Sequence, residues 1–142
     1  TNLLFDLASL YESNGLQDNA ILTYKKLLSI DPAHKEAKNS LAMLYNSKGV
    51  SLALQGKTDD AIAAYKDALQ NKEDFKEAYN NLGAAYVDKE MIDDAIAAYK
   101  KALEISPNFG EVYNNLGVAY TKKKEQRKGD FRITAFRIEV TA

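Results

Sequence analysis

The sequence predicts an all-α solenoid of stacked antiparallel helix pairs, on three observations. First, the chain repeats itself at a fixed offset: EAYNNLGAAY at 77–86 returns as EVYNNLGVAY at 111–120, and DDAIAAYKDAL at 59–69 returns as DDAIAAYKKAL at 93–103. Second, the apolar residues of each copy are spaced by three and four, which is helical periodicity. Third, only two prolines and seven glycines occur in 142 residues, a composition that favours helix.

Each unit contains two helical stripes separated by a helix-stop signal. In the unit at 76–109, one stripe ends near Asp88 and the second begins at Ala95. Gly15 and Gly56 stand between the corresponding stripes upstream, and glycine adopts the left-handed backbone that ends a helix. One column just before the second helix is always aspartate, where we expect a cap on free N–H groups and on the positive helix dipole. Its members are Asp18, Asp59 and Asp93.

Small residues recur where the two helices of a unit should touch. Gly83 and Gly117 lie on first helices, and Ala61 and Ala95 lie on second helices. A glycine inside a helix costs about 0.5–1 kcal/mol relative to alanine, so its repetition indicates a demand for close packing. We expect the tyrosines to fill the space beside these small residues as core, namely Tyr11, Tyr24, Tyr65, Tyr86, Tyr99 and Tyr120.

The pattern aromatic-x-x-Leu-Gly-x-x-Tyr carries a family resemblance. It occurs as Tyr79, Leu82, Gly83, Tyr86, then as Tyr113, Leu116, Gly117, Tyr120, and is followed by Ala95, Tyr99, Ala102 and Pro107. With its 34-residue period, the chain resembles the tetratricopeptide repeat (TPR) family from residue 1 to about 123. The resemblance implies a right-handed superhelix whose first helices line a concave groove, and such grooves bind extended or helical peptide segments of partner proteins.

The repeat divides a single domain, 1–142, into successive parts. Seven extra residues lie between Tyr45 and Tyr65, and seven residues are almost two helical turns, so the apolar stripe keeps its face. We therefore expect a first helix of about 20 residues there; alternatively, Gly49 ends a helix of normal length and the insertion is irregular. The parts are a repeat at 1–34, a repeat with the insertion at 35–75, a repeat at 76–109, the first helix of an incomplete repeat at 110–128 and a non-repeat tail at 129–142.

The C-terminal tail departs from the repeat. Gly129 and Ile133 stand where the second helix should have alanine and tyrosine. Phe136, Ile138 and Val140 alternate with polar residues, which predicts a short irregular or strand-like segment. The tail could cover the open end of the last helix, pair with another copy of the chain, or be foreign to the array; we favour the cover, because terminal repeats need a cap.

The groove is the expected functional site. An asparagine side chain offers a donor and an acceptor, so Asn81 and Asn115 could each hold a peptide backbone amide. The resemblance supports this role, because an asparagine in that column contacts peptide in several family members; the alternative is a solvated Asn-Asn face. The predicted lining is Glu77, Asn80, Asn81, Ala84, Asp88, Glu111, Asn114, Asn115, Val118 and Thr121.

The charged residues of the chain indicate which class of ligand to expect. A TPR subclass captures the C-terminal carboxylate of heat-shock chaperones with basic residues and asparagines, but the matching columns hold Phe5, Ser9, Glu77 and Asn81. The segment 1–120 has a net charge of −5, which favours a neutral or basic peptide or protein segment. The segment 121–142 carries seven basic and three acidic side chains, and this net charge of +4 fits a solvated helix end better than a nucleic-acid site.

Catalysis is not expected. His34 lies in a turn without a nucleophile beside it, the chain has no cysteine, and no phosphate loop, dinucleotide fingerprint or metal-ligand cluster is present. We therefore expect no cofactor, no metal and no enzymatic activity.

No apolar run approaches the roughly 20 residues of a membrane span, and the chain starts without a basic leader, so a cytoplasmic location is favoured. The predicted function is a protein-interaction scaffold; the alternatives are a self-assembling array, joined through the open end or the tail, and the substrate-selecting arm of a larger enzyme such as a glycosyltransferase.

Overall fold

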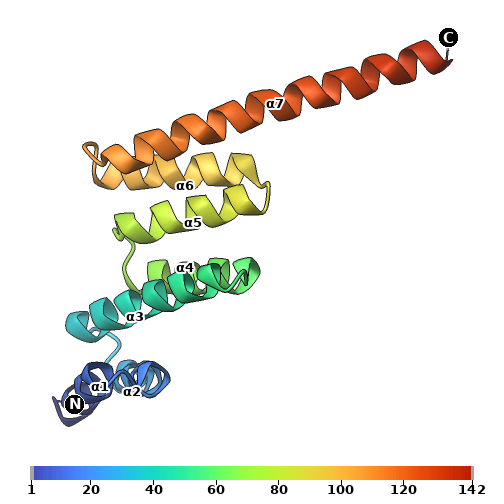
Figure 1. Cartoon of the computed structure of the whole chain (residues 1–142). Coiled ribbons are helices and arrows are strands. Elements are labelled where there is room, and N and C mark those ends of the chain that lie inside the picture. The colour runs from blue at the N-terminus through green and yellow to red at the C-terminus, as the bar shows by residue number, and fades with distance from the viewer. Residues whose placement is uncertain (1, 142) are drawn as a thin grey trace.

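The structure is a computed structural model that describes residues 2–141, and this part of the chain consists of helices joined by short turns (Figure 1). Successive helices run antiparallel, and the pairs stack on one another. The all-α prediction is confirmed, whereas the superhelical handedness stays a prediction. The helices are α1 (Asn2–Ser13), α2 (Gln17–Ile30), α3 (Lys35–Leu54), α4 (Thr58–Asn71), α5 (Lys76–Asp88), α6 (Ile92–Ile105) and α7 (Gly110–Thr141).

A left-handed residue makes the turn inside each helix pair. Gly15 has a φ of 73°, Gly56 has a φ of 77°, and the equivalent position of the third pair holds Glu90 at 61°. Glycine takes this conformation without a steric penalty, whereas glutamate does not. The third turn is therefore maintained by the packing of the helices on either side of it.

The strand-like tail predicted for 129–142 is wrong for residues 129–141, which continue α7 as helix; Ala142 lies outside the described residues. This part of α7 projects away from the stack, so it does not fold back over the open end as expected (Figure 1). The column of the left-handed turn holds Lys124 in this unit, and Lys124 stays helical within a run of strong helix formers. The β-branched alternation near Ile138 could form a strand only with a partner strand. The local helical preference therefore prevails.

The second and third helix pairs are each closed by a tyrosine ring that lies where a β-carbon would be. A β-carbon built on Gly83 would lie 2.5 Å from Cε1 of Tyr99, and one built on Gly49 would lie 2.5 Å from Cε1 of Tyr65. Both tyrosines are buried, so the packing demand inferred for Gly83 is confirmed. At Gly117 the same construction meets no atom within 4 Å, because within residues 2–141 no second helix packs on α7. For the same reason Tyr120, which was expected in the core, is 45% exposed.

Helix α3 meets its two neighbours in different registers. Toward α4 it follows the 34-residue period, because Gly49 contacts Tyr65 as Gly83 contacts Tyr99. Toward α2, equivalent residues of the next repeat lie further along the sequence, at an offset that exceeds the 34-residue period by the seven inserted residues. Nζ of Lys48 lies 3.4 Å from Asp18, just as Nζ of Lys89 lies 3.0 Å from Asp59.

Helix α3 is a single helix of 20 residues. The seven extra residues therefore shift α2 and α4 relative to each other along its axis. Its N-terminal part carries the buried residues Ala37, Leu41 and Leu44 against α2, and its C-terminal part packs on α4. At about 1.5 Å per residue, seven residues displace α2 from α4 by about 10 Å along the axis of α3. Figure 1 shows α1 and α2 beside the beginning of α3 and α4 beside its end.

The aspartate column does not cap the second helices as expected. The N-cap positions of α2, α4 and α6 have no side-chain hydrogen bond. Asp18, Asp59 and Asp93 lie in the first turn, where the dipole favours a carboxylate. Each pairs with a lysine of the next repeat, as Lys123 Nζ does with Asp93 at 2.7 Å. The Lys123 ammonium lowers the pKa of Asp93. Such exposed pairs contribute little stability individually.

Two matched glycine substitutions should have opposite effects on stability. Gly83→Ala should destabilise the chain by about 1 kcal/mol, because the new methyl group must displace the buried ring of Tyr99. Gly117→Ala should stabilise it by about 0.5–1 kcal/mol, because the helix gains alanine propensity in open space. Urea unfolding measures both, and shifts of the same sign would contradict the proposed role of the ring.

Candidate functional site on the first helices

Asparagine side chains join the first helices α3, α5 and α7 across successive units. Nδ2 of Asn81 donates to Oδ1 of Asn46 at 3.0 Å, and Nδ2 of Asn115 donates to Oδ1 of Asn80 at 3.0 Å. The two bonds span the same sequence separation, so one geometry occurs twice. We call these four residues the asparagine ladder, and we call the side of α3, α5 and α7 that bears it the first-helix face.

Asn80 has a supporting position within the ladder. Its side chain is only 5% exposed. Its Nδ2 donates to Oε1 of Glu111 at 3.3 Å, while its Oδ1 accepts from Asn115. Because both ends of the buried amide are engaged, Asn80 fixes the side chains of Glu111 and Asn115 and is not itself available to a ligand.

The other residues predicted for the groove are accessible. Asn81 and Asn115 are half-buried, and the remaining members are exposed: Glu77, Ala84, Asp88, Glu111, Asn114, Val118 and Thr121. Three of them, Asn114, Val118 and Thr121, lie together around a hollow of about 550 Å³ beside Gly117. The structure thus places three of the ten predicted residues in the ladder and three others around the hollow on α7.

Sequence reasoning missed Asn46, the ladder member on α3. The signal was present, because Tyr45-Asn46 stands one repeat period before Tyr79-Asn80. The seven-residue insertion masks this match, although the second half of the segment 35–55 still follows the regular period.

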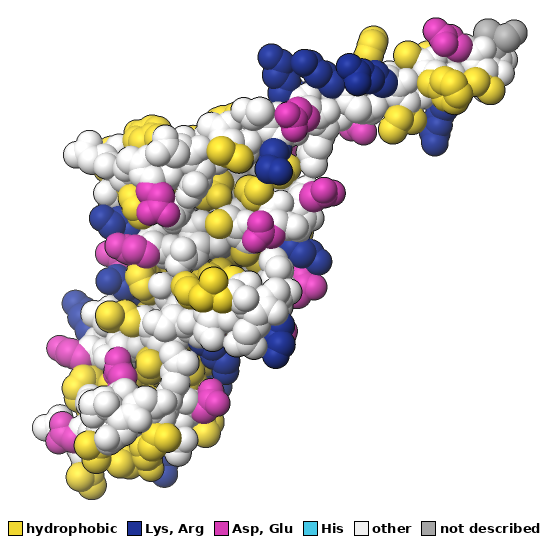
Figure 2. Space-filling model, in the orientation of Figure 1, with side chains coloured by type: hydrophobic (Ala, Val, Ile, Leu, Met, Phe, Trp, Pro, Cys, Tyr) yellow, Lys and Arg dark blue, Asp and Glu magenta, His cyan; other side chains and the backbone are white. Residues whose placement is uncertain are grey.

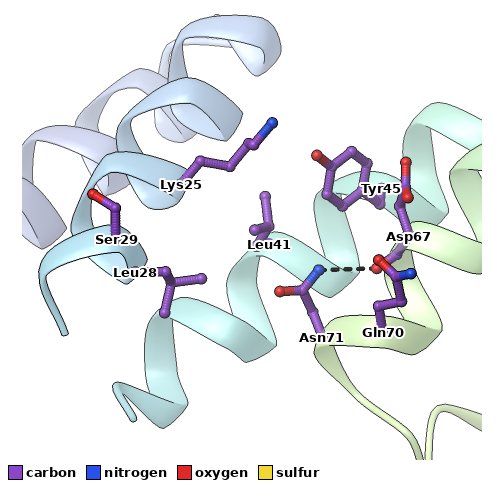
Figure 3. A pocket seen from close by; sticks show the side chains of 8 residues that line it. All are labelled: Lys25, Leu28, Ser29, Leu41, Tyr45, Asp67, Gln70 and Asn71. Carbon is purple, nitrogen blue, oxygen red and sulfur yellow. Dashed lines mark hydrogen bonds between the residues drawn. The ribbon is translucent and has the colours of Figure 1, made fainter. Parts of the chain in front are cut away.

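A second hollow, of about 450 Å³, lies where α2 and α4 are staggered along α3 (Figure 3). Leu41 and Tyr45 of α3 form its floor, with Lys25 on one side and Asp67 on the other. Burial, and secondarily the nearby Asp67 carboxylate, raises the pKa of Tyr45. The sequence did not predict this hollow, because it arises from the relative position of two helices that are not neighbours in the chain. Its complete lining is Lys25, Leu28, Ser29, Leu41, Tyr45, Asp67, Gln70 and Asn71.

His34 has a structural position. Its Nδ1 accepts a hydrogen bond from the backbone N–H of Ala37 at 3.2 Å, which caps α3. Its ring stacks on Phe5 with the centroids 5.3 Å apart. These contacts fix the turn that leads into the longer helix.

Within residues 2–141, no group of three or more His, Cys, Asp or Glu side chains is placed to hold a metal ion. No helix in the same range combines the length and the apolar character needed to cross a bilayer.

The chain matches family models of a known helical repeat. The features that the repeat shows here are paired helices, a glycine under a tyrosine ring and a 34-residue period. The family model described as TPR repeat matches residues 49–90 and 85–124, and the one described as Tetratricopeptide repeat matches residues 1–34. The chain belongs to the tetratricopeptide repeat family.

Curated relatives match this TPR chain over less than half of its length. A probable UDP-N-acetylglucosamine–peptide N-acetylglucosaminyltransferase SPINDLY of Hordeum vulgare is 38% identical over 61 residues, which are 43% of this chain and 6% of the relative. The photosystem I assembly protein Ycf3 of Cyanophora paradoxa is 31% identical over 64 residues, 45% of this chain and 37% of the relative. The chain therefore spans well under half of the length of these relatives.

Solved structures share the fold over more of the chain. A crystal structure of MamA superposes with a TM-score of 0.57 at 26% identity, covering 82% of this chain and 84% of MamA. The first TPR of Spaghetti (RPAP3) bound to an HSP90 peptide superposes with a TM-score of 0.52 at 24% identity, covering 84% of this chain and 89% of the other. At that identity, the second likeness concerns the fold alone.

The two donors of the ladder should differ in their effect on stability. Asn115→Ala should cost about 1–3 kcal/mol, because it leaves Oδ1 of the buried Asn80 without its donor. Asn81→Ala should cost about 1 kcal/mol or less, because its acceptor Asn46 is partly exposed and can bind water. Chemical denaturation of both variants measures the difference, and equal costs would contradict the supporting role of Asn80.

Alkaline pH should weaken the fold through Tyr99. Burial, with secondary contributions from Asp88 and Glu111, raises the pKa of Tyr99 from 10.0 to about 12. The folded state favours the neutral phenol, so stability is retained below pH 10 and falls as the pH rises from 10 to about 12, where only the unfolded chain ionises readily. In Tyr99→Phe this component of the pH dependence should disappear, as measured by urea unfolding across that range.

Proposed function

We propose that this chain is a noncatalytic protein-interaction scaffold that binds a peptide segment of a partner protein on its first-helix face, in the concave groove of the TPR array. The observation that carries the proposal is the asparagine ladder, which orients polar side chains of three successive first helices along one surface. The fold likeness to the RPAP3 TPR, whose structure contains a bound HSP90 peptide, supports this class of function.

The ladder leaves hydrogen-bonding capacity for a ligand. Asn81 and Asn115 each use one amide proton within the protein, and an asparagine side chain has a second proton and a carbonyl oxygen. A peptide backbone also offers one donor and one acceptor per residue. The two half-buried amides can therefore bind an extended main chain while tolerating many side-chain sequences.

The charges beside the ladder favour a basic or neutral peptide. Glu77, Asp88 and Glu111 are exposed, and they belong to the part of the chain whose net charge is −5. Complementary charge speeds encounter and suppresses wrong partners more than it adds affinity. Ala84 lies among these acids as a small exposed residue, which leaves space for a ligand side chain.

Reversing two groove charges tests the proposal. The double variant Glu77→Lys with Asp88→Lys should lose the preference for lysine-rich over glutamate-rich peptides and weaken binding of the former by about tenfold. The measurement is fluorescence anisotropy on an array of short peptides graded in charge. The matched control, Glu73→Lys with Asp74→Lys, changes the net charge equally in an exposed inter-repeat turn. Parent-like preference in the groove variant, or an equal loss in the control, would count against the first-helix face.

Two other functions follow from separate observations. The 61-residue match to a glycosyltransferase makes the chain a candidate for the substrate-selecting arm of a larger enzyme, which the coding sequence flanking this segment would reveal. The exposed apolar side chains of the last helix make self-assembly through the open end or the C-terminal segment a second candidate. Light scattering over a concentration series tests for such a homo-oligomer.

A further inference from the structure

Within residues 2–141, no second helix packs on α7, whereas each earlier first helix has one. At Gly83 and Gly49 the space above the glycine is filled by a tyrosine ring of the following helix, whereas at Gly117 no atom lies within 4 Å of a built β-carbon. The hollow beside Gly117 has a volume of about 550 Å³. Tyr113, which lines the hollow, is 53% exposed, and Tyr120, two turns further along the helix, is 45% exposed.

The unpartnered surface continues along the protruding half of α7. Phe131 stands two heptads after Gly117, and Ile138 stands one heptad later still. Both remain on the same side of the helix, because a heptad completes almost two turns. Phe131 is 75% exposed and Ile138 is 63% exposed. We call this side the open face of α7, and its members are Tyr113, Gly117, Tyr120, Phe131, Ala135 and Ile138.

We propose that the open face of α7 binds a helix of a partner protein, antiparallel to α7, that places an aromatic side chain against Gly117 and carries acidic residues near its N-terminus. The chain contains the template for this pairing. The sequence 111–120 repeats 77–86 almost letter for letter, and the earlier copy is occupied by α6, whose Tyr99 fills the space above Gly83.

Charge selects an acidic helix as the occupant. Residues 121–141 carry seven basic and three acidic side chains, and Figure 2 shows lysine and arginine side chains gathered along the protruding α7 with apolar side chains beyond them. In the template, α6 starts with Asp93 and Asp94 and runs antiparallel to α5. On a helix docked on α7 in the same orientation, an acidic N-terminal turn would lie near Lys124 and Lys128, so an acidic partner helix is complementary to α7 in charge as well as in shape.

The same charge argues against a second copy of α7 as the occupant. Two antiparallel α7 helices joined by their open faces would bring two basic segments together, and like charges in contact destabilise an interface. The proposed surface is also separate from the asparagine ladder. The hollow beside Gly117 shares Asn114, Val118 and Thr121 with the predicted groove, but Glu77 and Asp88 take no part in it, so the variants that test the two proposals change different residues.

The test uses the full chain and a synthetic peptide with the sequence of residues 92–105 preceded by four glutamates. Fluorescence anisotropy of the labelled peptide should show saturable binding that weakens as salt is added. Gly117→Leu in the chain should weaken binding by at least about tenfold, because leucine occupies the space for the ring. Tyr99→Ala in the peptide should have an effect of the same size, and this arm does not depend on the folding of a chain variant.

Matched controls separate this pairing from unspecific adhesion. Ala97→Leu in the chain adds similar bulk at an exposed position of α6, and Lys100→Ala in the peptide truncates a residue that is exposed in the template; both should leave binding unchanged. Lys124→Glu with Lys128→Glu should weaken it. The groove variant Glu77→Lys with Asp88→Lys should bind this peptide as the parent does.

Three outcomes would overturn the proposal. The peptide could fail to bind, or bind Gly117→Leu and the parent equally, in which case the open face is not a helix site. Alternatively, the chain alone could sediment as a dimer that Gly117→Leu dissociates, which would assign the face to a second copy.

Discussion

The fit of a tyrosine ring over a glycine is the contact on which the rest of the stack depends. Gly49 and Gly83 let the second helix approach until the rings of Tyr65 and Tyr99 occupy the space of the missing β-carbons. This approach fixes the distance and register of each helix pair, and the first helices of successive pairs then lie near enough for the asparagine ladder to form. The ladder is a consequence of the packing, because hydrogen bonds of this kind add only about 1 kcal/mol each.

The same contact explains which parts of the fold could be predicted. Gly83 was informative because a glycine inside a helix has a cost that only close packing offsets. The end of α7 was not predictable from such local signals. Glu90 and Lys124 occupy one column, and neither is a good left-handed residue, yet only Glu90 turns. The difference lies downstream, since α6 supplies a ring that packs on α5, whereas Gly129 and Ile133 stand where the corresponding alanine and tyrosine would be. A turn that depends on tertiary packing cannot be read from its own residues.

The candidate site shows a similar division. The asparagine columns could be found by counting residues, but the partners of adjacent asparagines could not. Asn80 and Asn81 are neighbours in sequence, and about 100° of rotation around α5 separates their side chains, so one bonds to α7 and the other to α3. Which of them is buried depends on where the neighbouring helices lie. The hollow between α2 and α4 was beyond sequence reasoning for the same reason, because it results from the stagger along α3.

Helix α3 also shows that insertions in a stacked array are restricted to certain lengths. Both faces of a first helix are occupied, one by the preceding second helix and one by its own. An insertion of three or four residues would rotate one face against the other by about 60° or 40°, whereas seven residues rotate it by only about 20°. A heptad can therefore slide one half of a repeat protein past the other while the apolar stripe of the shared helix keeps its direction, which gives evolution a discrete set of displacements for altering the shape of the surface.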